Sequence, residues 1–110
     1  MKVKKTSLEI YEPAMCCPSG VCGPEPDKDL IRFNRDLEKL REECQWLEVM
    51  RASLSFDANK FLENQTIFEL VRENGAGILP VTMLGGEIVA QQKYLRYEEL
   101  KALVEARVNA

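Results

Sequence analysis

A helix-forming segment between two strand-forming segments is the feature that most constrains how this chain can fold. Residues 6–11 alternate with period two, and residues 46–52 also carry the pattern of a strand. Between them, apolar side chains recur at the spacing of one helix face, with Asp27 as the N-cap. These side chains are Leu30, Phe33, Leu37, Leu40 and Cys44. Because two strands joined by such a helix favour a right-handed parallel crossover, the first half is predicted to be a β-α-β unit.

The second half of the chain carries signals for two helices, a hairpin and a final helix. The predicted segments are a short helix after Asp57, a helix from about Asn64 to Asn74, strands over residues 79–84 and 87–91, and a helix from Tyr97 to Val108. Gly75 provides a C-terminal stop for the second of these helices, and Gly85-Gly86 is a two-residue hairpin signal. The final helix lacks a good N-cap in its own sequence.

The predicted order of elements is β-α-β-α-β-β-α, a parallel strand pair followed by an antiparallel hairpin. This α/β order, with a Leu79-Pro80 step before the third strand, resembles the thioredoxin fold. The resemblance implies a four-stranded mixed sheet and a cis Leu79-Pro80 bond that faces the cysteine segment. With 110 residues, of which 45% are hydrophobic, we expect a single domain over residues 1–110. Glu9 is unusual if the first strand is central in that sheet.

Composition and charge exclude several classes of function. The net charge is −3, and Lys2, Lys4 and Lys5 form no extended basic block, so nucleic acid and anionic membranes are poor default partners. No apolar run approaches the roughly 20 residues of a spanning helix, and the N-terminus lacks the apolar stretch of a signal peptide. We therefore expect a cytoplasmic protein. Histidine is absent, which excludes histidine-dependent catalysis and zinc sites with imidazole ligands, so sulfur must carry any chemistry.

Three cysteines lie within seven residues, in the pattern C-C-x4-C. Cys16, Cys17 and Cys22 belong to a segment from Pro13 to Pro26 that contains four prolines, which predicts a loop. A structural disulfide is one interpretation. It conflicts with the reducing compartment, and adjacent Cα atoms lie about 3.8 Å apart whereas disulfides prefer about 5.5–6 Å.

A thiol-disulfide oxidoreductase is a second interpretation of these cysteines. Such enzymes need a thiol pKa lowered by cations or a helix N-terminus, and usually a C-x-x-C pair, which is missing here. The flanking residues are instead acidic. Between residues 9 and 29, Lys28 is the one basic residue, whereas five residues are acidic: Glu9, Glu12, Glu25, Asp27 and Asp29. We therefore expect no enzymatic activity and no catalytic residue.

Binding of a soft ion by thiolates is the third interpretation, and the residues favour it. Structural zinc takes four ligands, whereas trivalent arsenic or antimony makes three bonds, so three thiols complete its valence. Pro18 and Gly20 let the loop fold back so that Cys22 reaches the Cys16-Cys17 pair. Copper(I) satisfies the same softness argument. Cys44, by contrast, continues the apolar helix spacing and is predicted to fill the core as a small hydrophobe.

The chain also resembles a known family, the arsenical-resistance D proteins. The most specific match is the Pro-Ala-Met-Cys-Cys-x-x-Gly-Val-Cys-Gly stretch from Pro13 to Gly23, followed by Leu79-Pro80 and the turn at Gly85-Gly86-Glu87. The resemblance implies that Cys16, Cys17 and Cys22 bind trivalent arsenic or antimony as cargo, with no tightly bound cofactor.

The same resemblance implies partners. Members of the family are arsenic metallochaperones that deliver cargo to an arsenite-pump ATPase, are reported as homodimers, and are also described as weak operon repressors. The sequence shows no helix-turn-helix signature or basic stripe, so operator DNA is only a second expectation. Some members carry further cysteine pairs near the C-terminus, and residues 106–110 contain none, which argues against a second metalloid site.

Overall fold

The computed structural model describes residues 6–14 and 28–108, and these form four strands and five helical segments. The strands are β1 (Thr6–Glu12), β2 (Leu47–Ser53), β3 (Val81–Leu84) and β4 (Glu87–Gln91). The helices are α1 (Lys28–Glu43), α2 (Ala58–Glu63), α3 (Gln65–Asn74), the 3-10 turn η1 (Ala76–Ile78) and α4 (Tyr97–Val108). The predicted order of elements is confirmed. The predicted N-cap at Asp27 lies outside the described residues.

The strands form one mixed sheet in the order β2-β1-β3-β4. β1 runs parallel to β2, with Thr6 opposite Leu47, and antiparallel to β3, which in turn pairs antiparallel with β4. The predicted parallel crossover, the hairpin and the cis Leu79-Pro80 bond are all confirmed. β1 is therefore an interior strand, and Glu9 stands in the middle of it.

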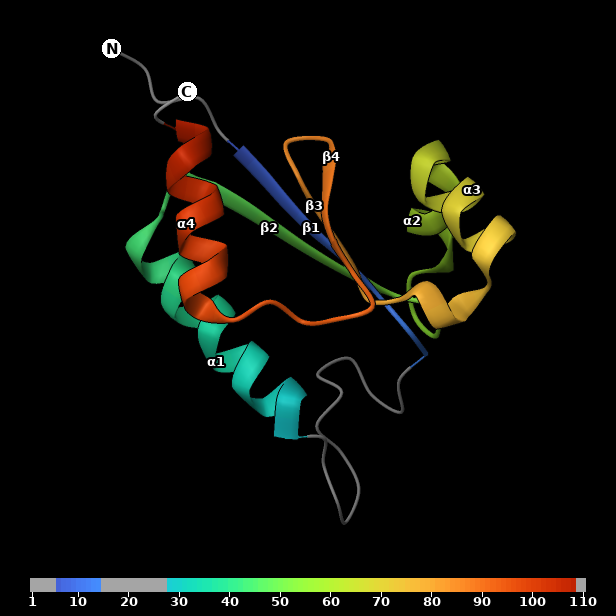
Figure 1. Cartoon of the computed structure of the whole chain (residues 1–110), viewed down its shortest axis with the longest axis horizontal. Coiled ribbons are helices and arrows are strands. Elements are labelled where there is room, and N and C mark those ends of the chain that lie inside the picture. Colours follow the sequence, from blue (N-terminus) through green and yellow to red (C-terminus); the bar gives the residue numbers. More distant parts are fainter. Residues whose placement is uncertain (1–5, 15–27, 109–110) are drawn as a thin grey trace.

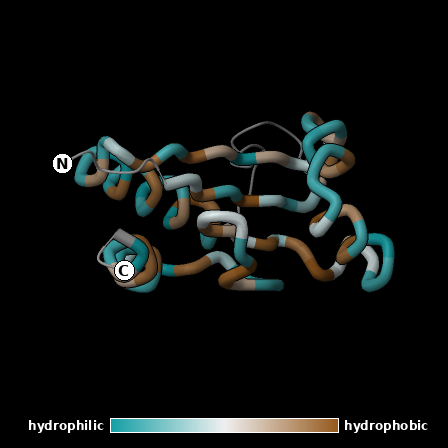
Figure 2. The backbone as a smooth tube through the Cα atoms, turned by 90° about the horizontal axis from the view of Figure 1, so that it is seen from above, coloured by the Kyte–Doolittle hydropathy of each residue, from teal (hydrophilic) through white to brown (hydrophobic). Residues whose placement is uncertain are grey.

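Helices cover both faces of the sheet, as Figure 1 shows. Leu8 and Ile10 of β1 pack against α1 and α4, whereas Tyr11 packs on the other face against α2 and α3. This division follows from strand geometry, because successive side chains of a strand point to opposite faces. Hydrophobic and hydrophilic residues alternate along the helix tubes in Figure 2, as expected for helices that bury only one side.

The apolar spacing that predicted α1 is the face that the helix buries. Leu30, Phe33, Leu37 and Leu40 are all buried, and the last three belong to the apolar cluster that α1 forms with the sheet and α4. Cys44 completes the last turn, since its backbone N–H donates to the Leu40 carbonyl at 2.8 Å. Its side chain is 5% exposed, so the prediction that Cys44 is a core residue is confirmed.

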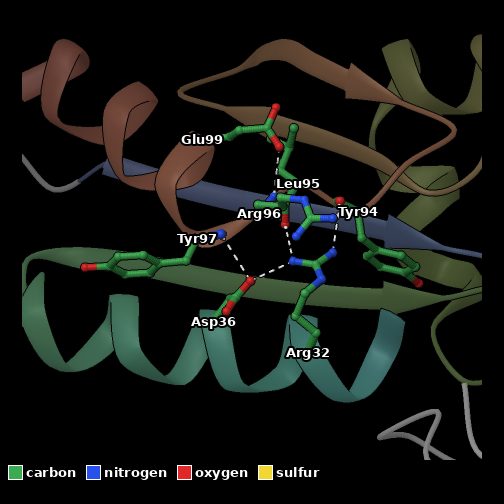
Figure 3. Close-up of polar contacts among 7 residues, drawn as sticks. All are labelled: Arg32, Asp36, Tyr94, Leu95, Arg96, Tyr97 and Glu99. Atoms are coloured by element: carbon green, nitrogen blue, oxygen red, sulfur yellow. Dashed lines mark hydrogen bonds and ion pairs between the residues drawn. The ribbon is translucent and has the colours of Figure 1, made fainter. Parts of the chain in front are cut away.

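The N-terminus of α4 is capped by a residue from α1. The backbone N–H of Tyr97 donates to Oδ2 of Asp36 at 3.0 Å (Figure 3). The N–H of Arg96 donates to Oε1 of Glu99 at 3.0 Å, and this hydrogen bond holds the pKa of the Glu99 carboxyl below its ordinary value. These two acceptors satisfy N–H groups that a helix leaves unpaired at its start. The cap that the sequence around Tyr97 lacks is thus supplied by a residue 61 positions earlier.

Arg32 holds the capping carboxylate in place. Its Nη1 lies 2.7 Å from Oδ2 of Asp36 and also donates to the Leu95 carbonyl at 3.3 Å. Its Nη2 donates to the Tyr94 carbonyl at 3.3 Å, so one guanidinium fixes both the cap and the loop before α4 (Figure 3). This arrangement joins α1 to the C-terminal part of the chain.

Replacing Asp36 with Ala should lower the free energy of unfolding by about 1–2 kcal/mol, because the variant loses both the cap and the partner of Arg32. Urea denaturation at neutral pH measures this loss, and hydrogen exchange should show faster exchange of the first-turn amides of α4. Glu42→Ala, which removes an exposed carboxylate of the same helix, is the matched control. Equal losses in the two variants would contradict the capping role.

Candidate functional site

The predicted site residues Cys16, Cys17 and Cys22 lie outside the described residues. Their place in the chain is nevertheless defined by its two ends. The segment that contains them begins after Ala14, which follows β1, and ends at Lys28, the first residue of α1. The cysteines therefore belong to the connection that leaves the carboxyl end of an interior strand, where α/β folds commonly carry functional loops.

An ion pair between a buried carboxylate and a half-buried guanidinium fixes the strand end from which this connection leaves. Glu12 is the last residue of β1, and only 2% of it is exposed. Arg51 of β2 approaches it side on, with Nε donating to Oε2 at 2.8 Å and Nη2 donating to Oε1 at 2.6 Å. Such a two-point contact sets both the distance and the orientation of the two groups.

Further contacts to this pair come from α1 and from the loop before α4. The Tyr94 hydroxyl donates to Oε1 of Glu12 at 2.9 Å, and Nη1 of Arg51 donates to Oδ1 of Asn34. The Arg51 guanidinium also lies 5.4 Å from the centre of the Phe33 ring. We call Glu12, Arg51, Asn34 and Tyr94 the Glu12 cluster. It connects β1, β2, α1 and the loop before α4 at the carboxyl end of β1.

The Glu12 cluster changes the electrostatic argument about the cysteines. In the sequence, Glu12 counts as one of the acidic residues that disfavour thiolates. In the structure its charge is balanced by Arg51 at 2.6 Å, so it adds little negative potential to the connection. Sequence reasoning missed this pairing, because the predicted first strand ended at Tyr11 and left Glu12 outside the sheet. Arg51 did lie in a predicted strand, and charges inside a sheet are seldom unpaired.

The cis Leu79-Pro80 bond lies at the same end of the sheet as Glu12. Tyr11 of β1 is opposite Val81 of β3, so Pro80 comes next to the carboxyl end of β1. The backbone N–H of Gln92 holds this region by donating to the Pro80 carbonyl at 2.8 Å and to the Ile78 carbonyl at 3.0 Å. The expected contact between Leu79-Pro80 and the cysteines falls outside the described residues.

Cys44 is unsuited to the chemistry expected of the other three cysteines. Burial raises the pKa of its thiol, and the thiolate is the form that binds metals. Among residues 6–14 and 28–108, no group of three or more Cys, Asp or Glu side chains is arranged to hold a metal ion. In the same residues, no helix is both long and apolar enough to cross a membrane.

Comparison with known proteins identifies the family of the chain. The model of a family described as arsenical resistance operon protein ArsD matches residues 5–110. The chain belongs to the ArsD family. The resemblance seen in the cysteine segment is thereby confirmed over nearly the whole length of the chain.

Curated relatives of this ArsD-family chain are named as repressors. A protein of Halobacterium salinarum, named as an arsenical resistance operon repressor ArsD, is 45% identical over 100 residues, which cover 91% of this chain and 92% of the relative. An Escherichia coli protein named arsenical resistance operon trans-acting repressor ArsD is 33% identical over 94 residues, 86% of this chain and 77% of the relative. These names describe regulators and no enzyme.

Solved structures confirm the fold. The crystal structure of an arsenical resistance operon trans-acting repressor from Bacteroides vulgatus matches with a TM-score of 0.79 and 32% identity, covering 88% of this chain and 90% of that one. A thioredoxin mutant from Halobacterium salinarum matches with a TM-score of 0.54 and 18% identity, over 96% of this chain and 76% of that one. The thioredoxin-like α/β fold is therefore confirmed, and the distant thioredoxin likeness concerns the fold alone.

Removing one partner of the Glu12 cluster should be costly. Arg51→Met leaves the Glu12 carboxylate buried without its cation, and we expect a loss of about 2–3 kcal/mol in the free energy of unfolding. The double variant Glu12→Leu/Arg51→Met should lose less, because no unpaired charge remains. Thermal and urea unfolding of the three proteins measure the coupling. Arg41→Met, at an exposed arginine of α1, is the control and should change stability by less than about 0.5 kcal/mol.

Proposed function

We propose that this chain is a carrier of trivalent arsenic or antimony, which it holds on Cys16, Cys17 and Cys22 and passes to an arsenite-pump ATPase. The observation that carries the proposal is the presence of three thiols within seven residues, in an ArsD-family chain without histidine. Trivalent arsenic is soft and makes three bonds, so three thiolates complete its valence without a further ligand.

The remaining cysteine supports this division of roles. Cys44 is buried in the core with a raised thiol pKa, so the proposed ligands are the three cysteines of one short segment. That segment leaves a strand end held by the Glu12 cluster, which gives the proposed site a rigid support at its N-terminal side. Lys28 begins α1 at its other side.

A carrier also requires that the ion can leave. A thiolate-bound metalloid can move stepwise, with one incoming sulfur forming a bond as one outgoing sulfur is released and protonated, so the total number of bonds is kept. This exchange needs partner cysteines near the site and no oxidant. The recipient in the proposal is therefore a protein with its own cysteine ligands, such as an arsenite-pump ATPase.

A metalloid-responsive repressor is the second candidate, and the names of the relatives favour it. It uses the same three thiols, but binding of the ion would weaken the hold on operator DNA. Gel-shift titration with an operator fragment at physiological salt separates the two candidates. A repressor binds that fragment in preference to random DNA and releases it when arsenite is added, whereas a carrier shows neither effect.

Serine substitutions should separate the proposed ligands from the core cysteine. Cys16→Ser, Cys17→Ser and Cys22→Ser should each weaken arsenite binding severely with little change in stability, because each removes one thiolate ligand. Cys44→Ser is the matched control: binding should persist, while a buried hydroxyl lowers the free energy of unfolding by about 1–3 kcal/mol. Isothermal calorimetry under reducing conditions measures arsenite binding. X-ray absorption should show three sulfur neighbours around the bound arsenic. Oxygen ligands, a four-coordinate shell, or binding lost only in Cys44→Ser would contradict the site.

Transfer is the most demanding test of the carrier. At low free arsenite, the loaded protein should raise the ATPase activity of an arsenite pump above that given by the same total arsenite alone. Loaded Cys44→Ser should act like the natural protein, and Cys22→Ser should not. If the loaded protein leaves the pump's half-saturating arsenite concentration unchanged, the carrier proposal is wrong even where the binding site is correct.

A further inference from the structure

Two adjoining hollows lie on the face of the sheet that α2 and α3 cover. The first has a volume of about 400 Å³ and the second about 430 Å³. The first is lined by Glu9, Tyr11, Met50, Lys60, Glu63, Asn64 and Gln65. The second is lined by Leu62, Glu63, Gln65 and Phe68. Because Glu63 and Gln65 line both, the hollows form one continuous surface, which we call the α2–α3 groove.

Glu9 places a carboxylate at the floor of the α2–α3 groove. It stands on the interior strand β1, where a charged side chain is unusual, and it is half-buried. The Tyr11 hydroxyl donates to Oε1 of Glu9 and accepts a hydrogen bond from Nδ2 of Asn64 at 3.0 Å. Asn64 is in turn fixed, because its Oδ1 accepts the N–H of Ile67 at 3.2 Å as the N-cap of α3. The carboxylate is thus held by a chain of bonds that ends on a helix cap.

The groove carries an excess of negative charge. Burial, and then the hydrogen bond to Glu9, raise the pKa of Tyr11 to about 12, so Tyr11 remains a neutral donor and the carboxylate an acceptor. Within the part of the chain that the structure describes, neither Glu9 nor Glu63 forms an ion pair, and exposed Lys60 is the one cation of the lining. A fixed, half-buried carboxylate that no cation of the described residues pairs with favours a cationic ligand.

Exposed apolar side chains continue the groove on its outer side. Leu62 is 66% exposed and Phe68 is 38% exposed, and both line the second hollow. Large apolar side chains beside a polar hollow are typical of surfaces that bind other proteins. The ligand that fits both halves therefore joins a positive charge to an apolar group.

We propose that the α2–α3 groove binds a protein segment that inserts an arginine side chain against Glu9 and packs an apolar side chain on Leu62 and Phe68. A guanidinium fits the first hollow because it is planar and offers two N–H groups to one carboxylate. Its aliphatic stem can lie along Met50. This surface is separate from the Glu12 cluster, which lies on the other face of the sheet, and the inference does not depend on whether the chain is a carrier or a repressor.

Peptide titration followed by NMR tests this inference on the full, reduced chain. The probes are the acetylated, amidated tetrapeptide Leu-Arg-Gly-Leu and the same peptide with neutral citrulline in place of arginine. The arginine peptide should shift the amide resonances of Glu63, Gln65 and Phe68, and the citrulline peptide should bind at least about fivefold more weakly. Equal binding of the two peptides, no binding of either, or shifts confined to other regions would overturn the proposal.

Three variants locate the interaction. Glu9→Gln keeps an acceptor for Tyr11 and removes the charge, so it should weaken binding of the arginine peptide by about tenfold. Leu62→Ser should weaken binding of both peptides, because both carry leucine. Phe56→Ser is the control, since Phe56 is 50% exposed but lines neither hollow, and it should bind the peptides as the natural protein does. Unchanged affinity in Glu9→Gln would refute the arginine site. If sedimentation shows that the natural protein is a dimer and that Leu62→Ser is a monomer, the groove binds a second copy of the chain. That outcome would also refute the proposal.

Discussion

The ion pair between Glu12 and Arg51 is the interaction on which the arrangement of this chain depends. It joins two parallel strands at their carboxyl ends, and Asn34 and Tyr94 tie it to α1 and to the loop before α4. A buried ion pair is weak support for stability as such, since desolvation offsets much of the attraction between the charges. Its value here is positional, because β1, β2, α1 and the loop before α4 all meet at this ion pair, at the carboxyl end of β1.

The two faces of the sheet differ in the helices that cover them and in the side chains that they bury. The face toward α1 and α4 contains the larger apolar cluster together with Glu12, and the Asp36 cap joins its two helices. The other face is covered by two short helices, with Tyr11, Phe61 and Ile67 at its centre and the α2–α3 groove at its border. A well-anchored half that supports the cysteine connection is thus combined with a half that offers surface to other molecules.

Periodicity in the sequence predicted most of the fold, because spacing records which side of an element is buried. The apolar stripe from Leu30 to Leu40 and the Gly85-Gly86 turn identified their elements correctly, and Tyr97–Val108 was delimited to the residue. Contacts between distant residues leave no such periodic signal. The cap of α4 by Asp36 and the pairing of Glu12 with Arg51 could not be predicted, since any of several charged residues could have served. The three ligand cysteines remain a prediction from their spacing and from family membership.

The acidic residues of β1 have a consequence for how that strand can pair. Glu9 and Glu12 are three positions apart, so the two carboxylates point to opposite faces, one toward the α2–α3 groove and the other toward Arg51. A slip of β1 by one residue would carry Glu12 among the apolar side chains around Phe61 and place Tyr11 against the arginine. Such a slip would bury a charge without a partner. The polar residues of this strand therefore specify one alignment of the sheet more sharply than its apolar residues, which either face would accept.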